Sequence, residues 1–201
     1  MVSQRLVEFL PDPVVTKIKD NFDLTKPSKS IGKMGAFLGN FGALVRAYAY
    51  IRTLGKEGIN SISEDAVINA NYLRTKLENT LDLPYNRICS HEVVFSAKTI
   101  KEKYGVNALD ISKRLIDYNI HPPTMYFPLI VDEALLVEPT ETESKETLDD
   151  FIYVIKQIVD EAKTDPELLH NAPHNTPNKR LNEALAARNP KLSWRDTQLS
   201  S

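Results

Sequence analysis

Residues 121–146 read HPPTMYFPLIVDEALLVEPTETESKE, and this stretch alternates polar, proline-rich turns with short apolar runs. Two of the apolar runs, Met125 to Val131 and Ala134 to Val137, are joined by the polar pair Asp132-Glu133. That pattern predicts two antiparallel strands, because a short polar link connects antiparallel neighbours. Loops held by rigid strands often carry binding residues, so we expect the flanking turns to line a cleft.

Two helices are predicted ahead of this stretch. Apolar residues at helical spacing predict the first over residues 34–54, with Gly55 as its stop. Ser61 and Glu64 have the spacing of a capping box, so we expect the second helix to begin at Ser61 and to end before Pro84. The two helices are expected to pack antiparallel to each other.

Further elements lie on both sides of the opening stretch. Val93-Val94-Phe95 predicts a strand, and Asn107 with Asp110 predicts the start of a helix. Apolar residues at helical spacing over 148–162 predict the last strong helix. This order of helices and strands indicates an α+β fold with a small sheet covered on one face.

Composition limits the classes of function. The chain of 201 residues can form one domain with extensions, and its net charge of -2 provides no basic field for nucleic acid. Its one cysteine, Cys89, cannot form an intramolecular disulfide, and the sequence shows no cluster of metal ligands. There is no signal-peptide pattern and no apolar run of membrane-spanning length. We therefore expect a cytoplasmic protein without a metal, nucleic acid or membrane partner.

The turn that contains Thr140 and Glu141 has two explanations. Ser144 can cap the last helix while the acidic residues of the turn lie near the positive helix end. Alternatively, a strand-to-helix turn directs hydroxyls, carboxylates and backbone amides into a crevice, where they bind polar groups of a substrate. The residues by themselves leave both explanations open.

His121 precedes Pro122 and Pro123 and has two explanations as well. A histidine in such a turn commonly faces solvent, although its titration near neutral pH also allows a role in a site. The fixed φ angles of the prolines would hold Thr124 in one place. Either His121 or Thr124 could line a cleft.

Arginine and cysteine residues supply weaker candidates. Arg46 and Arg114 could bind a carboxylate, but Lys113 beside Arg114 favours a solvated helix face. Cys89 and His91 would share one face of a strand, which invites a thiolate hypothesis. Because no third orienting group is evident, we favour a buried or half-buried strand cysteine.

The two turns, together with shorter motifs elsewhere, resemble the C-terminal part of glycine dehydrogenase (decarboxylating), the P-protein family of the glycine cleavage system. Within that family, subunit 2 of the two-subunit bacterial form is most similar. The shorter motifs are Ser30-Ile31-Gly32-Lys33, Gly39-Asn40-Phe41-Gly42, Val45-Arg46-Ala47-Tyr48, Asn69-Ala70-Asn71-Tyr72 and Asp110-Ile111. Asn119 stands where the family usually has glycine, a departure that a left-handed helix terminus accommodates.

The resemblance implies the small C-terminal domain of a fold-type-I enzyme that uses pyridoxal phosphate. The family decarboxylates glycine and passes the aminomethyl group to the lipoyl arm of the H-protein. Its cofactor is bound by a lysine in a His-Lys-Thr segment ahead of the matching region, so we expect no catalytic residue in this chain. We further expect a C-terminal fragment that is inactive alone and does not stably bind pyridoxal phosphate.

The resemblance also implies the partners and the cleft residues. Expected partners are subunit 1, the lipoylated H-protein and glycine, in an oligomer. Expected substrate-cleft residues are Asn40, His121, Thr124, Thr140 and Glu141.

The prolines of the first and last segments, together with the resemblance, divide the chain into four parts. They are an extended N-terminal arm over 1–29, leading helices over 30–82 that join the missing large domain, a small α+β domain over 83–165 and a docking tail over 166–201. A function of a different class fits these parts too: a non-catalytic module that uses the same surfaces to bind a P-protein partner subunit.

Overall fold

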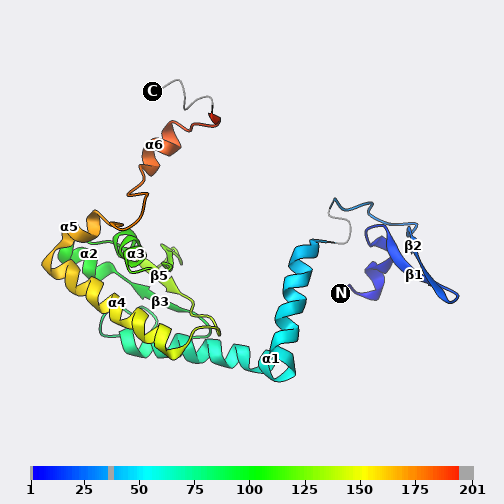
Figure 1. Ribbon diagram of the computed structural model, residues 1–201, viewed down its shortest axis with the longest axis horizontal. Helices are drawn as coiled ribbons and strands as arrows, with labels where there is room; N and C mark the ends of the chain where they lie inside the picture. The colour runs from blue at the N-terminus through cyan, green and yellow to red at the C-terminus, as the bar shows by residue number, and fades with distance from the viewer. Residues whose placement is uncertain (1, 36–38, 195–201) are drawn as a thin grey trace. The chain divides into compact units, whose positions relative to one another are not determined.

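The computed structural model describes residues 2–35 and 39–194, in two compact units that span 1–59 and 60–201 (Figure 1). Within the part of the chain so described, no helix is both long and apolar enough to cross a membrane. The four-part division expected from the sequence stays a prediction.

The first unit begins with a short 3-10 helix and a hairpin. After η1 (Gln4–Phe9), strands β1 (Val14–Ile18) and β2 (Asn21–Thr25) pair antiparallel. β-branched residues favour the strand conformation of β1, and the turn uses Lys19 at a positive φ of 55°. We expected an extended chain here, and the structure instead contains a hairpin because the β-branched run finds a pairing partner across the turn.

The Ser30-Ile31-Gly32-Lys33 motif has a local structural role in the first unit. The backbone N–H of Asp12 donates to the Gly32 carbonyl at 3.1 Å, and Ser30 Oγ donates to Asp12 Oδ1 at 3.4 Å. Gly32 has a φ of +101°, which side chains rarely permit. The motif therefore holds this segment against Asp12, a buried residue.

Helix α1 (Phe41–Leu77) contains both predicted leading helices. Gly55 breaks it with φ 64° and ψ −171°, at the predicted stop. The predicted capping box at Ser61 is wrong, because Ser61 lies inside the helix, which resumes directly after Gly55. The predicted start near residue 34 is also too early: Gly39 has a positive φ of 98°, and residues 36–38 of that prediction lie outside the described residues.

The second unit contains a three-stranded antiparallel sheet in the order β3-β5-β4. β3 (Val93–Ser96) is the strand predicted at Val93-Val94-Phe95, and β5 (Ala134–Val137) lies between it and β4 (Thr124–Met125). The predicted antiparallel pair is confirmed.

The strand predicted over 125–131 is much shorter than expected. β4 ends at Met125, and the Tyr126 N–H still donates to the Ala134 carbonyl at 2.9 Å. The strand does not continue, because Tyr126 adopts a positive φ of 57° and Pro128 has no N–H to donate. The apolar residues that follow form a loop, in which Leu129 is 88% exposed and Ile130 is 83% exposed.

Five further helices follow in the described residues up to 194. They are α2 (Lys98–Tyr104), α3 (Ala108–Asp117), α4 (Lys145–Thr164), α5 (Pro166–His170) and α6 (Glu183–Arg188). With the sheet, they confirm the α+β fold.

Local signals at both ends of α3 and at the start of α4 are confirmed. Asn107 and Asp110 form a reciprocal capping box at the start of α3, and Asn119 after its end has a left-handed φ of 59°. Ser144 caps α4 by accepting a hydrogen bond from the Thr147 N–H at 3.1 Å.

One hydrophobic core holds the second unit together. It joins the second part of α1, the sheet and helices α2 to α5, with Phe95 fully buried at its centre. The second part of α1 and α4 lie side by side (Figure 1), linked by a short hydrogen bond from Tyr72 Oη to Asp149. These two helices position the turn between β5 and α4.

Candidate functional site

In the turn between β5 and α4, the residue that caps the helix is distinct from the polar residues at the tip of the turn. Ser144 makes the helix cap, so the capping explanation accounts for Ser144. Thr140 lies four residues earlier, where its carbonyl accepts the Glu143 N–H at 3.2 Å and its hydroxyl lies 2.7 Å from that of Thr142. Thr140 is exposed and Glu141 is half-buried. The cap therefore does not explain the residues at the tip of the turn.

Asn69 of α1 holds this turn from the side. Its Nδ2 donates to the carbonyl oxygens of Thr140 at 2.9 Å and of Glu143 at 3.4 Å. Sequence analysis identified Asn69-Ala70-Asn71-Tyr72 as a motif without giving Asn69 a role. The available signal was the presence of two amides two residues apart on a helix, since such residues point toward different neighbours.

A cavity of about 570 Å3 joins the two turns quoted at the start of the sequence. His121 lines it from the first turn, and Pro139 and Glu143 line it from the second. Its apolar wall comes from the core-facing sides of α1, β5 and α4, including Leu73 and Phe151. The predicted meeting of the two turns is thus seen for His121 and the second turn.

Three of the predicted cleft residues lie close in sequence to residues that line this cavity, but they do not line it themselves. Thr124 is exposed on β4, opposite Leu136, while Thr140 and Glu141 lie beside the lining residue Pro139. Asn40 belongs to the first unit, where its Oδ1 caps α1 by accepting the Ala43 N–H at 3.1 Å. A role for these residues in a cleft stays a prediction.

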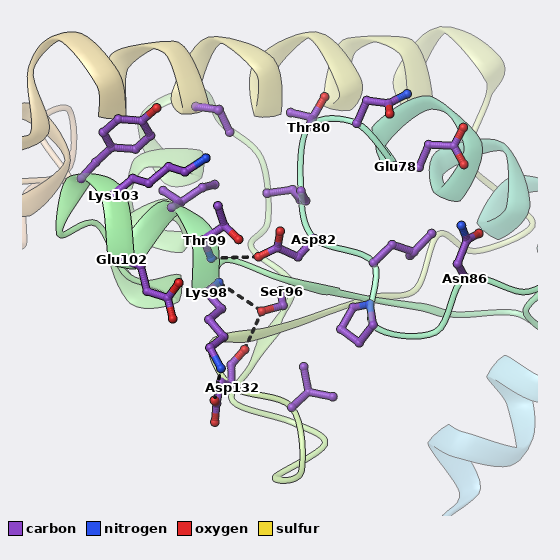
Figure 2. Close-up of a pocket in the computed structure, with 18 of the residues that line it drawn as sticks. Glu78, Thr80, Asp82, Asn86, Ser96, Lys98, Thr99, Glu102, Lys103 and Asp132 are labelled. Atoms are coloured by element: carbon purple, nitrogen blue, oxygen red, sulfur yellow. Dashed lines mark hydrogen bonds and ion pairs between the residues drawn. The ribbon is translucent and has the colours of Figure 1, made fainter.

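A larger pocket of about 1100 Å3 lies between the loop after α1, helix α2, the loop before β5 and helix α4 (Figure 2). Some of its labelled polar groups bond to one another. Asp82 accepts the Thr99 N–H at 2.8 Å, Ser96 Oγ donates to the Asp132 carbonyl at 2.6 Å, and Lys98 Nζ lies 3.1 Å from the Asp132 carboxylate. These groups therefore stabilise the loops, and sequence analysis did not identify this pocket.

The pKa values of four lysines indicate whether these residues could anchor pyridoxal phosphate. A lysine that forms a Schiff base needs a pKa below its ordinary value. Hydrogen bonds to carboxylates instead raise the pKa of each of four lysines: Lys98, Lys101, Lys145 and Lys163. These four lysines therefore do not fit as the anchor of the cofactor.

Arg114 binds a carboxylate of its own chain. Its Nε and Nη2 donate to the two carboxylate oxygens of Glu161, each at 2.9 Å, and Nη1 donates to Asp117 at 3.1 Å. Its guanidinium also lies 4.9 Å from the ring centroid of Tyr118. The hydrogen bonds to Glu161 are the main reason that the pKa of Arg114 is raised. The expected solvated face is wrong, and Arg114 is unsuited to substrate binding, whereas Arg46 is exposed on α1.

Cys89 lies in the loop ahead of β3, so the predicted strand position is wrong. Asn71 fixes its backbone, since Asn71 Nδ2 donates to the Cys89 carbonyl at 2.8 Å and the Cys89 N–H donates to Asn71 Oδ1 at 3.1 Å. Burial raises the pKa of the Cys89 thiol, and the residue is half-buried as expected. His91 lies 4.0 Å from Glu138, and the geometry does not support an activated thiolate.

Asp110 anchors the C-terminal segment to α3. The sequence predicted only its part in the start of the helix. This buried carboxylate lies 3.1 Å from His170 Nδ1 and accepts Arg180 Nη2 at 2.5 Å, in addition to the Asn107 N–H at 3.0 Å. Over residues 2–35 and 39–194, no three His, Cys, Asp or Glu side chains gather as a metal site requires.

Comparisons with known proteins agree on one family. The family model described as "Glycine dehydrogenase, C-terminal domain" matches residues 62–178. A probable glycine dehydrogenase (decarboxylating) subunit 2 from Thermotoga maritima is 52% identical over 96% of this chain and 41% of its own length. The corresponding protein of Listeria welshimeri is 52% identical over 96% of this chain and 40% of its own length. The chain thus spans about two fifths of the length of these relatives.

A solved structure supports the fold. The crystal structure of glycine decarboxylase (P-protein) of the glycine cleavage system, in inhibitor-bound form, aligns with a TM-score of 0.55 at 18% identity. The alignment covers 77% of this chain and 37% of that protein.

Proposed function

The chain belongs to the glycine dehydrogenase (decarboxylating) family, and on that premise we propose that it forms the C-terminal portion of a glycine decarboxylase. The intact protein uses pyridoxal phosphate to release carbon dioxide from glycine and passes the aminomethyl group to the lipoyl arm of the H-protein. Its partners are a subunit 1 and the lipoylated H-protein. We place the reaction in the cytoplasm, where a single free thiol such as Cys89 stays reduced.

The observation that carries this proposal is the cavity at which His121 meets Pro139 and Glu143. Its mixture of an apolar wall and a polar rim suits a cleft that binds a small polar substrate next to an aliphatic arm. His121 is then a residue of the cleft wall, and Thr124, Thr140 and Glu141 are neighbours of lining residues in the two turns. Asn40, which caps α1 in the first unit, is a separate candidate for substrate binding.

Pyridoxal phosphate supplies the stabilisation of the carbanion when it is bound. The four lysines with raised pKa values do not fit as its anchor, and none of the four is assigned to hold it. The chain is expected to be inactive alone. Its contribution is to bind and orient the substrate and to exclude water from the cleft.

The test uses the full-length subunit that carries this sequence, assembled with subunit 1 and the H-protein. His121→Ala or Glu141→Ala should lower kcat/KM for glycine–carbon dioxide exchange by about tenfold or more, which corresponds to roughly 1.4 kcal/mol of transition-state stabilisation. The melting temperature should change little, because neither residue caps a helix in this structure.

Glu146→Ala is the matched control, since Glu146 is an exposed acidic residue in the first turn of α4. Its exchange rate should equal that of the unmodified enzyme. Normal exchange in both His121→Ala and Glu141→Ala would exclude the proposed cleft wall.

A second candidate is a non-catalytic module that binds a partner subunit. The exposed apolar residues of the first unit favour it, because Phe41 is 79% exposed and Tyr48 is 66% exposed on α1. This candidate expects the chain of residues 1–201 to bind subunit 1 in sedimentation experiments without contributing to exchange. An exchange activity that requires His121 or Glu141 would favour the decarboxylase.

A further inference from the structure

Asn69 connects helix α1 to the turn that the proposed function places at the substrate cleft. Its Nδ2 reaches two carbonyl oxygens three residues apart, that of Thr140 at 2.9 Å and that of Glu143 at 3.4 Å. The same turn is closed by the Glu143 N–H, which donates to the Thr140 carbonyl at 3.2 Å. One side-chain amide therefore fixes both ends of the turn.

We propose that Asn69 is a positioning residue, which sets the place of Glu141 beside the cleft by holding the turn between Thr140 and Glu143. This inference rests on the proposed function, because it assumes that the turn contacts substrate. Asn69 acts through the turn backbone and is not a catalytic residue. The contact between the Thr140 and Thr142 hydroxyls, at 2.7 Å, depends on the same backbone conformation.

The chemistry of the contact explains why an amide is needed at this position. Both partners are carbonyl oxygens, so the side chain must donate two hydrogen bonds, and the NH2 group of asparagine has two protons. Aspartate has the same shape but would place an acceptor against two acceptors. Glutamine retains the NH2 group on a stem that is longer by one methylene.

Asn71 offers a matched control on the same helix. Like Asn69 it is half-buried, and its Nδ2 donates to a loop carbonyl, that of Cys89 at 2.8 Å. Its contacts fix the loop ahead of β3 and not the turn before α4. A loss of stability alone should therefore be similar for the two asparagines, whereas a loss of positioning should be specific to Asn69.

The first experiment measures activity in the full-length subunit assembled with subunit 1 and the H-protein. We expect Asn69→Asp to lower kcat/KM for glycine–carbon dioxide exchange by about tenfold, with a decrease in melting temperature no larger than that of Asn71→Asp. Asn69→Gln should recover part of the loss. Adding Asn69→Asp to Glu141→Ala should cause little further loss, because both changes remove one function.

The second experiment measures backbone hydrogen exchange over residues 138–144 in the same preparations. We expect faster exchange at this turn in Asn69→Asp and unchanged exchange in Asn71→Asp, because the Glu143 N–H is bonded within the turn. Unchanged backbone hydrogen exchange at the turn in Asn69→Asp overturns the inference, whatever the activity of the variant.

The two proposals fail in different ways. If Glu141→Ala lowers activity while Asn69→Asp and Asn71→Asp have the same kcat/KM, the positioning role is wrong and the cleft stands. Multiplicative losses in the double variant also overturn the positioning role. If Glu141→Ala and His121→Ala are both fully active, the cleft is wrong, and the positioning role fails with it even where the turn loosens.

Discussion

Tyr48 and Leu73 lie on the same helix, α1, yet Tyr48 is 66% exposed whereas Leu73 is 1% exposed. The difference follows the division of the chain into its two units. In the second unit, the sheet and the helices share one core. Among residues 2–35 and 39–59 of the first unit, the one buried residue is Asp12, a charged one. Secondary structure in the first unit is therefore built without a hydrophobic core.

The comparison shows that apolar periodicity alone does not tell where a side chain is covered. The first part of α1 has as clear an apolar pattern as the second part, and its apolar residues remain exposed. Such faces in a water-exposed chain are characteristic of surfaces that contact another polypeptide. This agrees with the proposal that the chain works as part of a larger protein.

The largest contrast should come from equivalent phenylalanine substitutions in the two units. Phe95 is 0% exposed and Phe22 is 70% exposed. Phe95→Ala should lower the free energy of unfolding by about 3–5 kcal/mol, because it leaves a cavity in the core. Phe22→Ala should change it by less than about 0.5 kcal/mol. Urea unfolding followed by circular dichroism would measure both, and equal losses would contradict the comparison.

A smaller contrast should separate ion pairs of the two units. The pair of Arg114 and Glu161 is largely covered, with side chains 14% and 20% exposed, while Lys29 and Glu8 pair at 2.8 Å with side chains 58% and 50% exposed. Glu161→Gln should lower the free energy of unfolding by about 2 kcal/mol, as expected for charge-assisted hydrogen bonds. Glu8→Gln should cost less than about 0.5 kcal/mol.

The Glu161 pair should also depend on pH. Burial acts to raise the pKa of Glu161, but hydrogen bonds from Arg114 and Tyr118 outweigh it and leave the pKa below its ordinary value. The stabilisation is therefore present above the unfolded pKa of about 4.3 and is lost as the pH falls through the lower folded pKa. Unfolding free energies measured from pH 6 down to pH 2 should fall less steeply in Glu161→Gln, and parallel curves would contradict the assignment.

Helix caps provide a third contrast. Asn107 caps α3, whose inner residues belong to the core, and Asn40 caps the exposed part of α1. Asn107→Ala should lower the free energy of unfolding of the second unit by about 1 kcal/mol. Asn40→Ala should shorten α1 locally and leave this unfolding transition unchanged. A shared loss would indicate that the two units unfold as one.

The smallest effect concerns thiol reactivity. Burial raises the pKa of Cys89, so less of its thiol is ionised at a given pH than in an exposed cysteine. Cys89 should react with a disulfide reagent at pH 8 several-fold more slowly than a cysteine introduced by Tyr48→Cys in a Cys89→Ser background. Both rates are read by absorbance, and equal rates would show that Cys89 is as accessible as the exposed face of α1.

Sequence patterns predicted the features that depend on neighbouring residues. The capping box of Asn107 and Asp110 and the cap at Ser144 are formed by residues three positions apart, so the sequence contains both partners. The short strand at Thr124 was overestimated, because apolar character continues through a segment where Tyr126 has a positive φ and Pro128 lacks a donor. The N-terminal hairpin was missed because the prolines of this segment favoured an extended arm, although a β-branched run follows them.

The candidate site shows the same limit. His121 lines one cavity with Pro139 and Glu143 of the second quoted turn, whereas the predicted residues Thr124, Thr140 and Glu141 do not line it. Arg114 was misjudged because its partner Glu161 lies 47 residues away, on another helix. Whether an arginine is solvated or paired depends on packing that no short sequence window contains.

The sequence by itself determined the family, the α+β class and the caps of α3 and α4, because each of these is encoded in local patterns of residues. Only the tertiary structure decided what two identical amides on α1 do. Asn69 reaches a carbonyl 71 residues away in the turn at Thr140, and Asn71 reaches one 18 residues away at Cys89. The physical reason is that the direction of each side chain follows from the helix, but its partner is brought there by the packing of α1 against α4 and the loop before β3.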